Sequence, residues 1–272
     1  MNNFWQRTFS GFLFVALIAG SILLSRYYVF VVTFAVICGL TVREFHKLTN
    51  QQPDVNVNQW LAIGGAVLLF ITSNLYANKT FIYPAFSAYG FYIVMALIVE
   101  LYAKKKNPIH NWAYFIIGQV LIALPFSLLN FILYINAWQP IILLAVFATI
   151  WLNDTGAYLV GITMGKHRLF ERISPKKSWE GFAGGAIAAL ISGYVFSLFL
   201  PQMNLLNWLI FSEIIVVFGT FGDLLESLLK RTIEVKDSGN VIPGHGGLLD
   251  RFDSMLLAAP VIFIYLSFIF YK

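Results

Sequence analysis

Residues 206–228 read LNWLIFSEIIVVFGTFGDLLESL, a stretch that is apolar along most of its length and contains no proline. A helix of about 20 residues crosses a bilayer core of roughly 30 Å, so this stretch is long enough to span a membrane. Its apolar residues are continuous, whereas a barrel strand alternates apolar and polar residues. Because only helices and closed barrels satisfy their backbone hydrogen bonds in lipid, the stretch predicts a transmembrane helix.

Similar stretches recur along the whole chain of 272 residues, of which 59% are hydrophobic and 11% charged, with a mean hydropathy of +0.75. A soluble domain typically carries about 25% charged residues. We predict nine spans, near residues 9–24, 27–42, 60–76, 84–103, 112–134, 139–161, 181–200, 206–228 and 254–271. The fold class predicted is therefore an all-α polytopic membrane protein.

The runs form one membrane domain over residues 1–272, with N-terminal spans at 1–134 and the polar motifs among the spans at 139–271. The first run lacks a small-residue cleavage site, so we expect a retained span and not a signal peptide. Pro125 is expected to kink the fifth span without breaking it. Residues 43–52 are expected to extend the second helix along the membrane surface. Cys38 is the single cysteine, which excludes an intrachain disulfide.

Lys and Arg residues gather in alternate connecting segments. If nine spans alternate, 15 of the 18 fall on the side of the N-terminus, and the other side holds only Arg26, Lys79 and Lys272. The positive-inside rule then predicts a cytoplasmic N-terminus and a C-terminus outside. We interpret the net charge of +5 as a signal of topology and not of nucleic-acid binding.

Charged residues crowd the end of the eighth span, FGDLLESLLKR. Asp223, Glu226, Ser227 and Lys230 follow the i, i+3, i+4, i+7 spacing of one helix face. An internal pair of Glu226 with Lys230 would explain those two residues as a helix end reaching out of the membrane. Asp223 lies one turn deeper and has no such partner in its own helix. A carboxylate at membrane depth is costly, so we interpret Asp223 as functional.

A glycine-rich segment, PGHGGLLDRFDS, occupies residues 243–254. Gly244, Gly246 and Gly247 would let backbone N–H groups approach an anion or a metal-bound ligand. Asp253 or Ser254 is expected to be the N-cap of the ninth span. Asp250 is interpreted instead as a metal ligand that converges with Asp223. Carboxylate oxygens, without cysteine, suit Mg²⁺, which commonly binds one or two carboxylates and substrate phosphates.

Two further motifs flank the seventh span. In SPKKSWEG, Ser174 or Ser178 is expected to cap the helix with Pro175 near its first turn, which would place Lys176 and Lys177 at a phosphate-binding helix N-terminus. The alternative is that these lysines only mark the inner face. In the sixth span, WLNDTGAYLVG carries Asn153 and Asp154 about two turns inside the helix, an expensive place for a carboxylate.

These motifs together resemble those of the phosphatidate cytidylyltransferases (CDP-diacylglycerol synthases). The resemblance is carried by Ser227-x-x-Lys230-Arg231-x4-Lys236-Asp237, by Pro243-Gly244-His245-Gly246-Gly247-x-x-Asp250-Arg251-x-Asp253, and by the blocks NDTGAY and SPKKSWEG. It covers residues 150–254 of the chain. The N-terminal half adds its spans and nothing more specific.

The resemblance implies a nucleotidyltransferase that converts CTP and phosphatidate into CDP-diacylglycerol and pyrophosphate with Mg²⁺, within phospholipid biosynthesis. It implies that Asp223 and Asp250 hold the cation, and it leaves room for a second, monovalent cation. The phosphates of both substrates would be shared among Lys176, Lys177, Lys230, Arg231, Lys236 and Arg251. Asp154 is a candidate for the same cavity, and His245 would either touch a phosphate or orient the glycine turn. In a bacterium this site would lie on the cytoplasmic face of the plasma membrane.

The rival hypothesis is a multi-pass transporter. A transporter would place its carboxylates near the membrane midplane in repeated halves, whereas the carboxylates here crowd one end of the spans and no repeat is visible. The partners expected are CTP, phosphatidate and membrane lipid, with no nucleic acid. The sequence leaves open whether the chain forms a homodimer.

Overall fold

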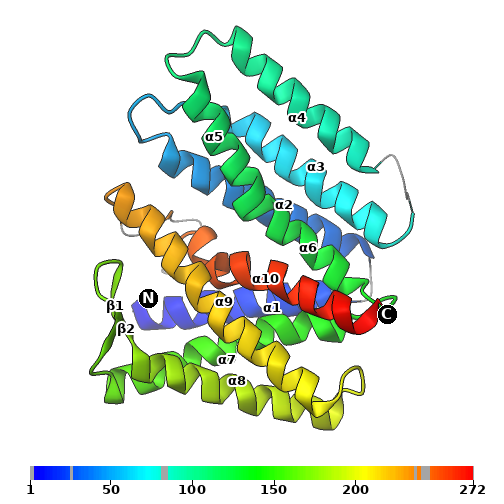
Figure 1. Cartoon of the computed structure of the whole chain (residues 1–272), viewed down its shortest axis with the longest axis vertical. Helices are drawn as coiled ribbons and strands as arrows, with labels where there is room; N and C mark the ends of the chain where they lie inside the picture. Colours follow the sequence, from blue (N-terminus) through cyan, green and yellow to red (C-terminus); the bar gives the residue numbers. More distant parts are fainter. Residues whose placement is uncertain (1–2, 25–26, 81–84, 236–237, 240–245, 272) are drawn as a thin grey trace. The chain divides into compact units, whose positions relative to one another are not determined.

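The computed structural model describes residues 3–24, 27–80, 85–235, 238–239 and 246–271. Helices dominate (Figure 1). The elements are α1 (Asn3–Leu23), α2 (Tyr27–Thr49), α3 (Gln59–Ala77), α4 (Ala85–Tyr102), α5 (Pro108–Gly118), the π-helical segment η1 (Gln119–Ala123), α6 (Leu124–Leu133), α7 (Pro140–Met164), β1 (Arg168–Phe170), β2 (Ser174–Ser178), α8 (Trp179–Phe199), α9 (Leu205–Thr232) and α10 (Leu249–Phe270).

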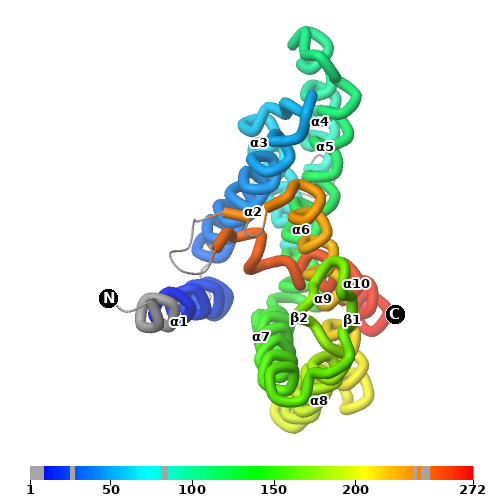
Figure 2. Tube along the Cα trace, turned by 90° about the vertical axis from the view of Figure 1, so that its left-hand side faces the viewer, coloured from blue at the N-terminus to red at the C-terminus, as the bar shows by residue number. Residues whose placement is uncertain are grey.

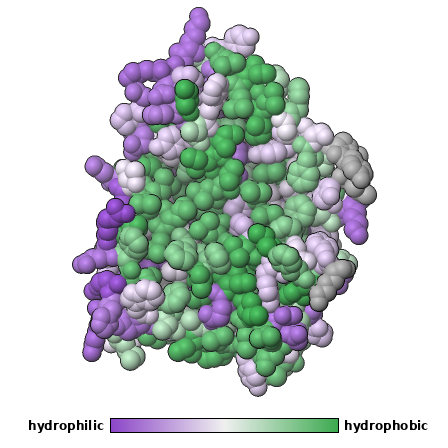
Figure 3. Space-filling model, in the orientation of Figure 1, coloured by the Kyte–Doolittle hydropathy of each residue, from purple (hydrophilic) through white to green (hydrophobic). Residues whose placement is uncertain are grey.

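The predicted spans coincide with these helices. Within the described residues, eight helical stretches are long and apolar enough to cross a membrane, and α1 contributes a shorter apolar stretch at Phe9–Leu23. Apolar side chains, green in Figure 3, cover most of the visible helical surface. Such a surface would be unstable in water and suits contact with lipid. The chain is a polytopic helical membrane protein, and the predicted fold class is confirmed.

The fifth predicted span is a continuous helix of three parts, α5, η1 and α6. Pro125 lies at the start of α6, directly after the π-helical turn. A proline ring clashes with the carbonyl four residues earlier and offers no N–H to it, and a wider π turn relieves that conflict. The N–H of Leu124 accordingly donates to the carbonyl of Gln119, five residues back. The prediction that Pro125 would not break the span is confirmed.

The described contacts divide the chain into two compact units. The first contains residues 1–140 and 233–251, and the second contains residues 141–232 and 252–272. In the first unit α3 packs against α2, α4, α6 and η1, and Figure 1 shows α3 beside α2 and α4. The prediction of a single membrane domain stays a prediction.

Buried amides hold the helices of the first unit together. The Nδ2 of Asn74 on α3 donates to the Oδ1 of Asn130 on α6 at 2.7 Å, and the Nε2 of Gln119 donates to the carbonyl of Ala62 at 2.9 Å. Helices in lipid gain little from hydrophobic burial against one another, so close packing and polar contacts of this kind stabilise them. The second helix of this unit continues to Thr49, as the sequence predicts.

Close glycine contacts hold the second unit together. A Cβ on Gly156 of α7 would lie 2.8 Å from the carbonyl oxygen of Gly184 on α8, and a Cβ on Gly222 of α9 would lie 3.2 Å from the Cα of Ser254 on α10. Only glycine lets backbones approach so closely. A short antiparallel hairpin, β1–β2, connects α7 to α8 (Figure 2), where the sequence predicts only a loop.

Candidate functional site

A cavity of about 310 Å³ lies within the second unit. Residues of α7, the β1–β2 hairpin, α8, α9 and α10 line it. They are Asn153, Asp154, Ala157, Tyr158, Gly161, Leu169, Lys176, Lys177, Ser178, Gly181, Phe182, Thr220, Asp223 and Ser254. The cavity therefore gathers polar residues from NDTGAY, from SPKKSWEG, from the end of the eighth span and, through Ser254, from the last residue of PGHGGLLDRFDS.

One wall of the cavity is formed by residues of the NDTGAY motif on α7. Asn153 is buried, and its Nδ2 lies 3.4 Å from the Oδ1 of Asp154, which is exposed. Gly156, three residues after Asn153, faces Gly184 and thereby brings α7 against α8. The local pattern thus keeps two polar side chains on a helix whose other residues are largely apolar.

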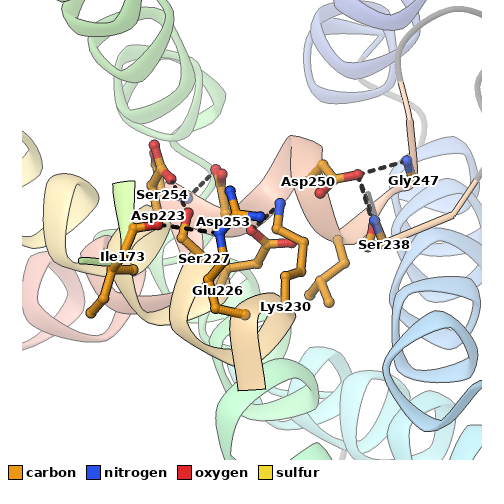
Figure 4. A network of polar contacts seen from close by, with 12 residues as sticks. Ile173, Asp223, Glu226, Ser227, Lys230, Ser238, Gly247, Asp250, Asp253 and Ser254 are labelled. Carbon is orange, nitrogen blue, oxygen red and sulfur yellow. Dashed lines mark hydrogen bonds and ion pairs between the residues drawn. The ribbon is translucent and has the colours of Figure 1, made fainter. Parts of the chain in front are cut away.

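An ion pair joins two of the predicted site residues across the cavity lining. The Nζ of Lys177 on β2 lies 2.6 Å from the Oδ2 of Asp223 on α9. The Oγ of Ser227 donates to the Oδ1 of Asp223 at 3.2 Å (Figure 4). Asp223 lacks a charged partner in its own helical sequence, and the hairpin supplies one. Both charged side chains keep part of their surface exposed, 26% for Lys177 and 32% for Asp223, so a polar ligand can reach them.

The SPKKSWEG motif begins as a strand and becomes a helix at its end. Ser178 is the N-cap of α8, and its Oγ accepts a hydrogen bond from the N–H of Gly181 at 3.1 Å. Ser174 lies at the start of β2, paired with Phe170, so the alternative that Ser174 caps the helix is wrong. Pro175 is likewise in the strand and not in the first helical turn. Lys176 and Lys177 therefore lie within β2, and the hairpin register pairs the last residue of this strand, Ser178, with Arg168.

Replacing Ser178 with alanine should lower the stability of the protein by about 1 kcal/mol, since that is the usual contribution of an N-cap serine. The measurement is the midpoint of thermal unfolding in detergent. Ser174→Ala, which removes a hydroxyl from the same motif without touching the cap, is the matched control and should leave the midpoint unchanged. Equal shifts in the two variants would contradict the capping role.

Asp253 is the site residue that sequence reasoning missed. It lies inside α10, as does Ser254, so the prediction that one of them is the N-cap of this helix is wrong. Its carboxylate is half-buried and has the carboxylates of Asp223 and Asp154 as electrostatic neighbours. The signal was present in the sequence: the i, i+3 spacing of Asp250 and Asp253 places both on one face of a helix that starts earlier than expected.

The remaining charged residues at the end of α9 form a separate pair. The Nζ of Lys230 lies 2.6 Å from the Oε2 of Glu226, whose side chain is buried. The expected internal pair is therefore present. The Nε of Arg231 donates to the carbonyl of Ile173 at 3.4 Å, which ties the end of α9 to the hairpin turn. Roles for Lys230 and Arg231 toward phosphate stay predictions.

In the first unit, Ser238 and Gly247 donate hydrogen bonds to Asp250. The Oδ2 of Asp250 accepts hydrogen bonds from the N–H of Gly247 at 2.9 Å, from the Oγ of Ser238 at 2.9 Å and from the N–H of Ser238 at 3.1 Å (Figure 4). Gly246 has a φ of 78°, a conformation that favours glycine. The Gly247 N–H that we expected to face a ligand thus holds Asp250.

Several predicted site residues lie outside the described residues, namely Lys236, Asp237, Gly244 and His245. Arg251 is described and exposed, at the start of α10. Lys176 is exposed and lines the cavity beside Lys177.

The carboxylates suit a cation that substrate oxygens help to bind. Within the described part of the chain, no group of three or more His, Cys, Asp or Glu side chains is arranged to hold a metal by itself. The acidic neighbours in the second unit supply hard oxygen ligands, and lysines adjoin them. Mg²⁺ usually binds to one or two carboxylates and completes its shell with phosphates and water. The residues present therefore fit Mg²⁺ delivered with a phosphate compound.

Comparison with known proteins identifies the class. Residues 5–269 match the model of the cytidylyltransferase family, so the chain belongs to that family. The phosphatidate cytidylyltransferase of Staphylococcus haemolyticus is 50% identical over 126 residues, which cover 46% of this chain and 48% of the relative. The phosphatidate cytidylyltransferase of Bacillus subtilis is 49% identical over 122 residues, which cover 43% and 44%. The chain spans about half the length of the curated relatives that it matches.

Proposed function

We propose that the protein transfers the cytidylyl group of CTP to phosphatidate, giving CDP-diacylglycerol and pyrophosphate. The observation that carries this proposal is the cavity in which Lys176, Lys177 and Asp223 meet, in a membrane protein of the cytidylyltransferase family. Lysines attract the phosphates of both substrates, and the carboxylate suits a cation. The family membership favours an enzyme over a transporter.

The proposed reaction is a direct displacement at the α-phosphorus of CTP. An oxygen of the lipid phosphate forms a bond to the α-phosphorus, the bond from that phosphorus to the oxygen bridging to the β-phosphate breaks, and pyrophosphate leaves with the bonding electrons. A phosphate monoester has a second pKa of about 6, so the lipid phosphate is largely dianionic at neutral pH. No strong general base is needed, and the protein must mainly align the phosphates and neutralise their charge.

Each residue has a role in that scheme. Lys177, paired with Asp223 before substrate arrives, exchanges part of this contact for a phosphate, and Lys176 adds a second positive charge from the same strand. Asp223 and Asp250 are the proposed ligands of Mg²⁺, as their sequence motif predicts, and Asp253 adds negative charge near Asp223. Bound Mg²⁺ supplies charge neutralisation on the phosphate oxygens. Asn153 and Asp154 would contact the polar parts of the substrates.

We also propose that the cavity faces the cytoplasm, where CTP is found. The asymmetry of Lys and Arg between alternate connections supports this orientation, and the relatives are bacterial proteins, which favours the plasma membrane.

The test is a direct assay of purified protein in detergent with phosphatidate, CTP and Mg²⁺, following pyrophosphate release and the CDP-lipid. We expect both products in equal amounts. Adding EDTA should abolish them, and excess Mg²⁺ should restore them, because the phosphate charges are otherwise not neutralised. Ca²⁺ in place of Mg²⁺ is the control for divalent charge alone. Full activity in EDTA would contradict the metal, and absence of product with phosphatidate would contradict the substrate.

A further inference from the structure

A buried carboxylate from the N-terminal half of the chain contacts the glycine-rich segment. Glu44 lies near the end of α2 and is only 5% exposed. Its Oε2 accepts a hydrogen bond from the N–H of Leu249 at 2.9 Å and lies 3.5 Å from the Oγ of Ser238. These residues and Glu44 all belong to the first unit. The contact joins positions about 200 residues apart in sequence.

Two glycines pack tightly against this carboxylate. A Cβ on Gly239 would lie 2.8 Å from the Oε1 of Glu44, and a Cβ on Gly247 would lie 2.5 Å from its Oε2. Real side chains do not approach this closely. At Gly239 the end of Glu44 would have to shift, whereas at Gly247 a Cβ would also lie 2.9 Å from the backbone N of Gly239, so Gly247 has the stronger need for glycine. The requirement for glycine at Gly247 therefore comes at least partly from Glu44 and not only from a substrate.

Glu44 also stabilises the start of the helix that carries Asp250. Leu249 is the first residue of α10, and the first N–H groups of a helix have no partner within it. A negative charge at a helix N-terminus is favourable because it complements the helix dipole. Glu44 thus accepts a hydrogen bond from the first N–H group of α10 and caps this helix from α2.

Ser238 connects Glu44 to Asp250. Its Oγ contacts the Oε2 of Glu44 and donates to the Oδ2 of Asp250, and its N–H donates to the same oxygen. Two acidic side chains that share one serine repel each other, and burying a carboxylate is costly unless hydrogen bonds compensate. An apolar residue at position 44 would avoid both costs, but it would leave the Leu249 N–H and Ser238 without this acceptor.

We infer that Glu44 is a positioning residue, which holds residues 238–239 and 246–250 so that Asp250 is oriented for the metal before substrate binds. The inference rests on the proposed function, in which Asp250 is a metal ligand. Residues that orient a metal ligand are worth about 10- to 100-fold in metal affinity or activity. Glu44 itself touches neither substrate nor metal in this scheme.

The experiment compares full-length wild-type protein with Glu44→Ala and Glu44→Gln. The first readout is amide hydrogen exchange of the metal-free protein over peptides covering residues 246–251. Glu44→Ala should exchange faster there, on the order of tenfold, because the hydrogen bond to a charged acceptor is lost. The second readout is the Mg²⁺ concentration that gives half-maximal activity, which should rise by about tenfold, while the KM for CTP at saturating Mg²⁺ stays within about twofold.

Glu100→Ala is the matched control. Glu100 is another buried carboxylate of the first unit, but it accepts a hydrogen bond from Asn111 at 2.6 Å and pairs with Lys105 at 2.9 Å, and neither partner belongs to residues 238–239 or 246–250. Its removal should leave the exchange of residues 246–251 and the Mg²⁺ requirement unchanged. Glu44→Gln keeps an oxygen that can accept from Leu249 and should fall between wild type and Glu44→Ala in both readouts.

Unchanged exchange or an unchanged Mg²⁺ requirement in Glu44→Ala would overturn the inference, and so would equal effects from Glu100→Ala. If Glu44→Ala does not fold, Glu44→Gln provides the test. Wild-type values of both the amide exchange and the Mg²⁺ requirement in Glu44→Gln would then overturn the inference. If wild-type protein makes no CDP-lipid, the proposed function fails by itself. The exchange experiment would then still show whether Glu44 holds the segment.

Discussion

Asp223→Asn should lower the rate of CDP-diacylglycerol formation by at least about a hundredfold, with the protein still folded. The substitution keeps the size of the side chain but removes its charge. Lys177 then loses the partner that lies 2.6 Å from its Nζ, and the proposed Mg²⁺ loses a ligand. Changes to residues that only orient metal ligands already cost about 10- to 100-fold, so losing a ligand should cost more. The measurement is kcat for pyrophosphate release at saturating CTP and Mg²⁺.

Glu213→Gln is the control for this prediction. Glu213 is a carboxylate of the same helix, α9, but it lines an apolar groove with Leu209, Ile210 and Val217 and is no part of the cavity lining. Its loss should leave kcat unchanged. Near wild-type activity in Asp223→Asn would show that Asp223 is not part of the active site, and it would not affect the family assignment.

Gly222→Val should strongly reduce the yield of folded protein and lower the midpoint of thermal unfolding. A Cβ at this position would meet the carbonyl oxygen of Asp253 and lie 3.2 Å from the Cα of Ser254, so backbone would have to move. Overpacking of this kind typically costs about 1–3 kcal/mol. The displaced helix carries Asp253, so activity per folded molecule should fall as well. Size-exclusion recovery, thermal unfolding and the pyrophosphate assay measure the three effects.

Gly90→Val supplies the matched comparison for that change. Gly90 is also a helical glycine within an apolar span, but a Cβ there meets nothing within 4 Å. Both variants introduce the same side chain into a membrane helix, and only Gly222→Val meets backbone. Equal behaviour of the two variants would mean that the α9–α10 contact does not limit folding.

The positions of the helices were predictable because the physics that determines them is local. A span must be apolar over about 20 residues whatever surrounds it, so runs such as 60–76 and 206–228 predict α3 and α9 closely. The same holds for Ser178, whose capping hydrogen bond joins residues three positions apart. The family was likewise predictable from the motifs around Asp223 and Asp250, and residues 5–269 match its model.

The start of α10 shows where local reasoning fails. The sequence around Asp253 and Ser254 offers acceptable N-caps, yet the helix begins at Leu249. The acceptor for the N–H of Leu249 is Glu44, which comes from α2. No local pattern reports such an acceptor. Because α10 begins at Leu249, Asp253 lies inside the helix, with Asp223 and Asp154 as electrostatic neighbours.

By itself, the sequence determined the membrane class and the spans, because hydropathy and helical spacing act over neighbouring residues, and its motifs indicated the family. Tertiary structure alone decided which groups meet: Lys177 pairs with Asp223 only because the β1–β2 hairpin turns the lysine strand toward the cavity, and Glu44 reaches Leu249 only because α2 packs beside the glycine-rich segment. Contacts between distant segments depend on how close the backbones come. That distance depends on the fit of facing helix surfaces, with glycines such as Gly184 and Gly222 at the closest points.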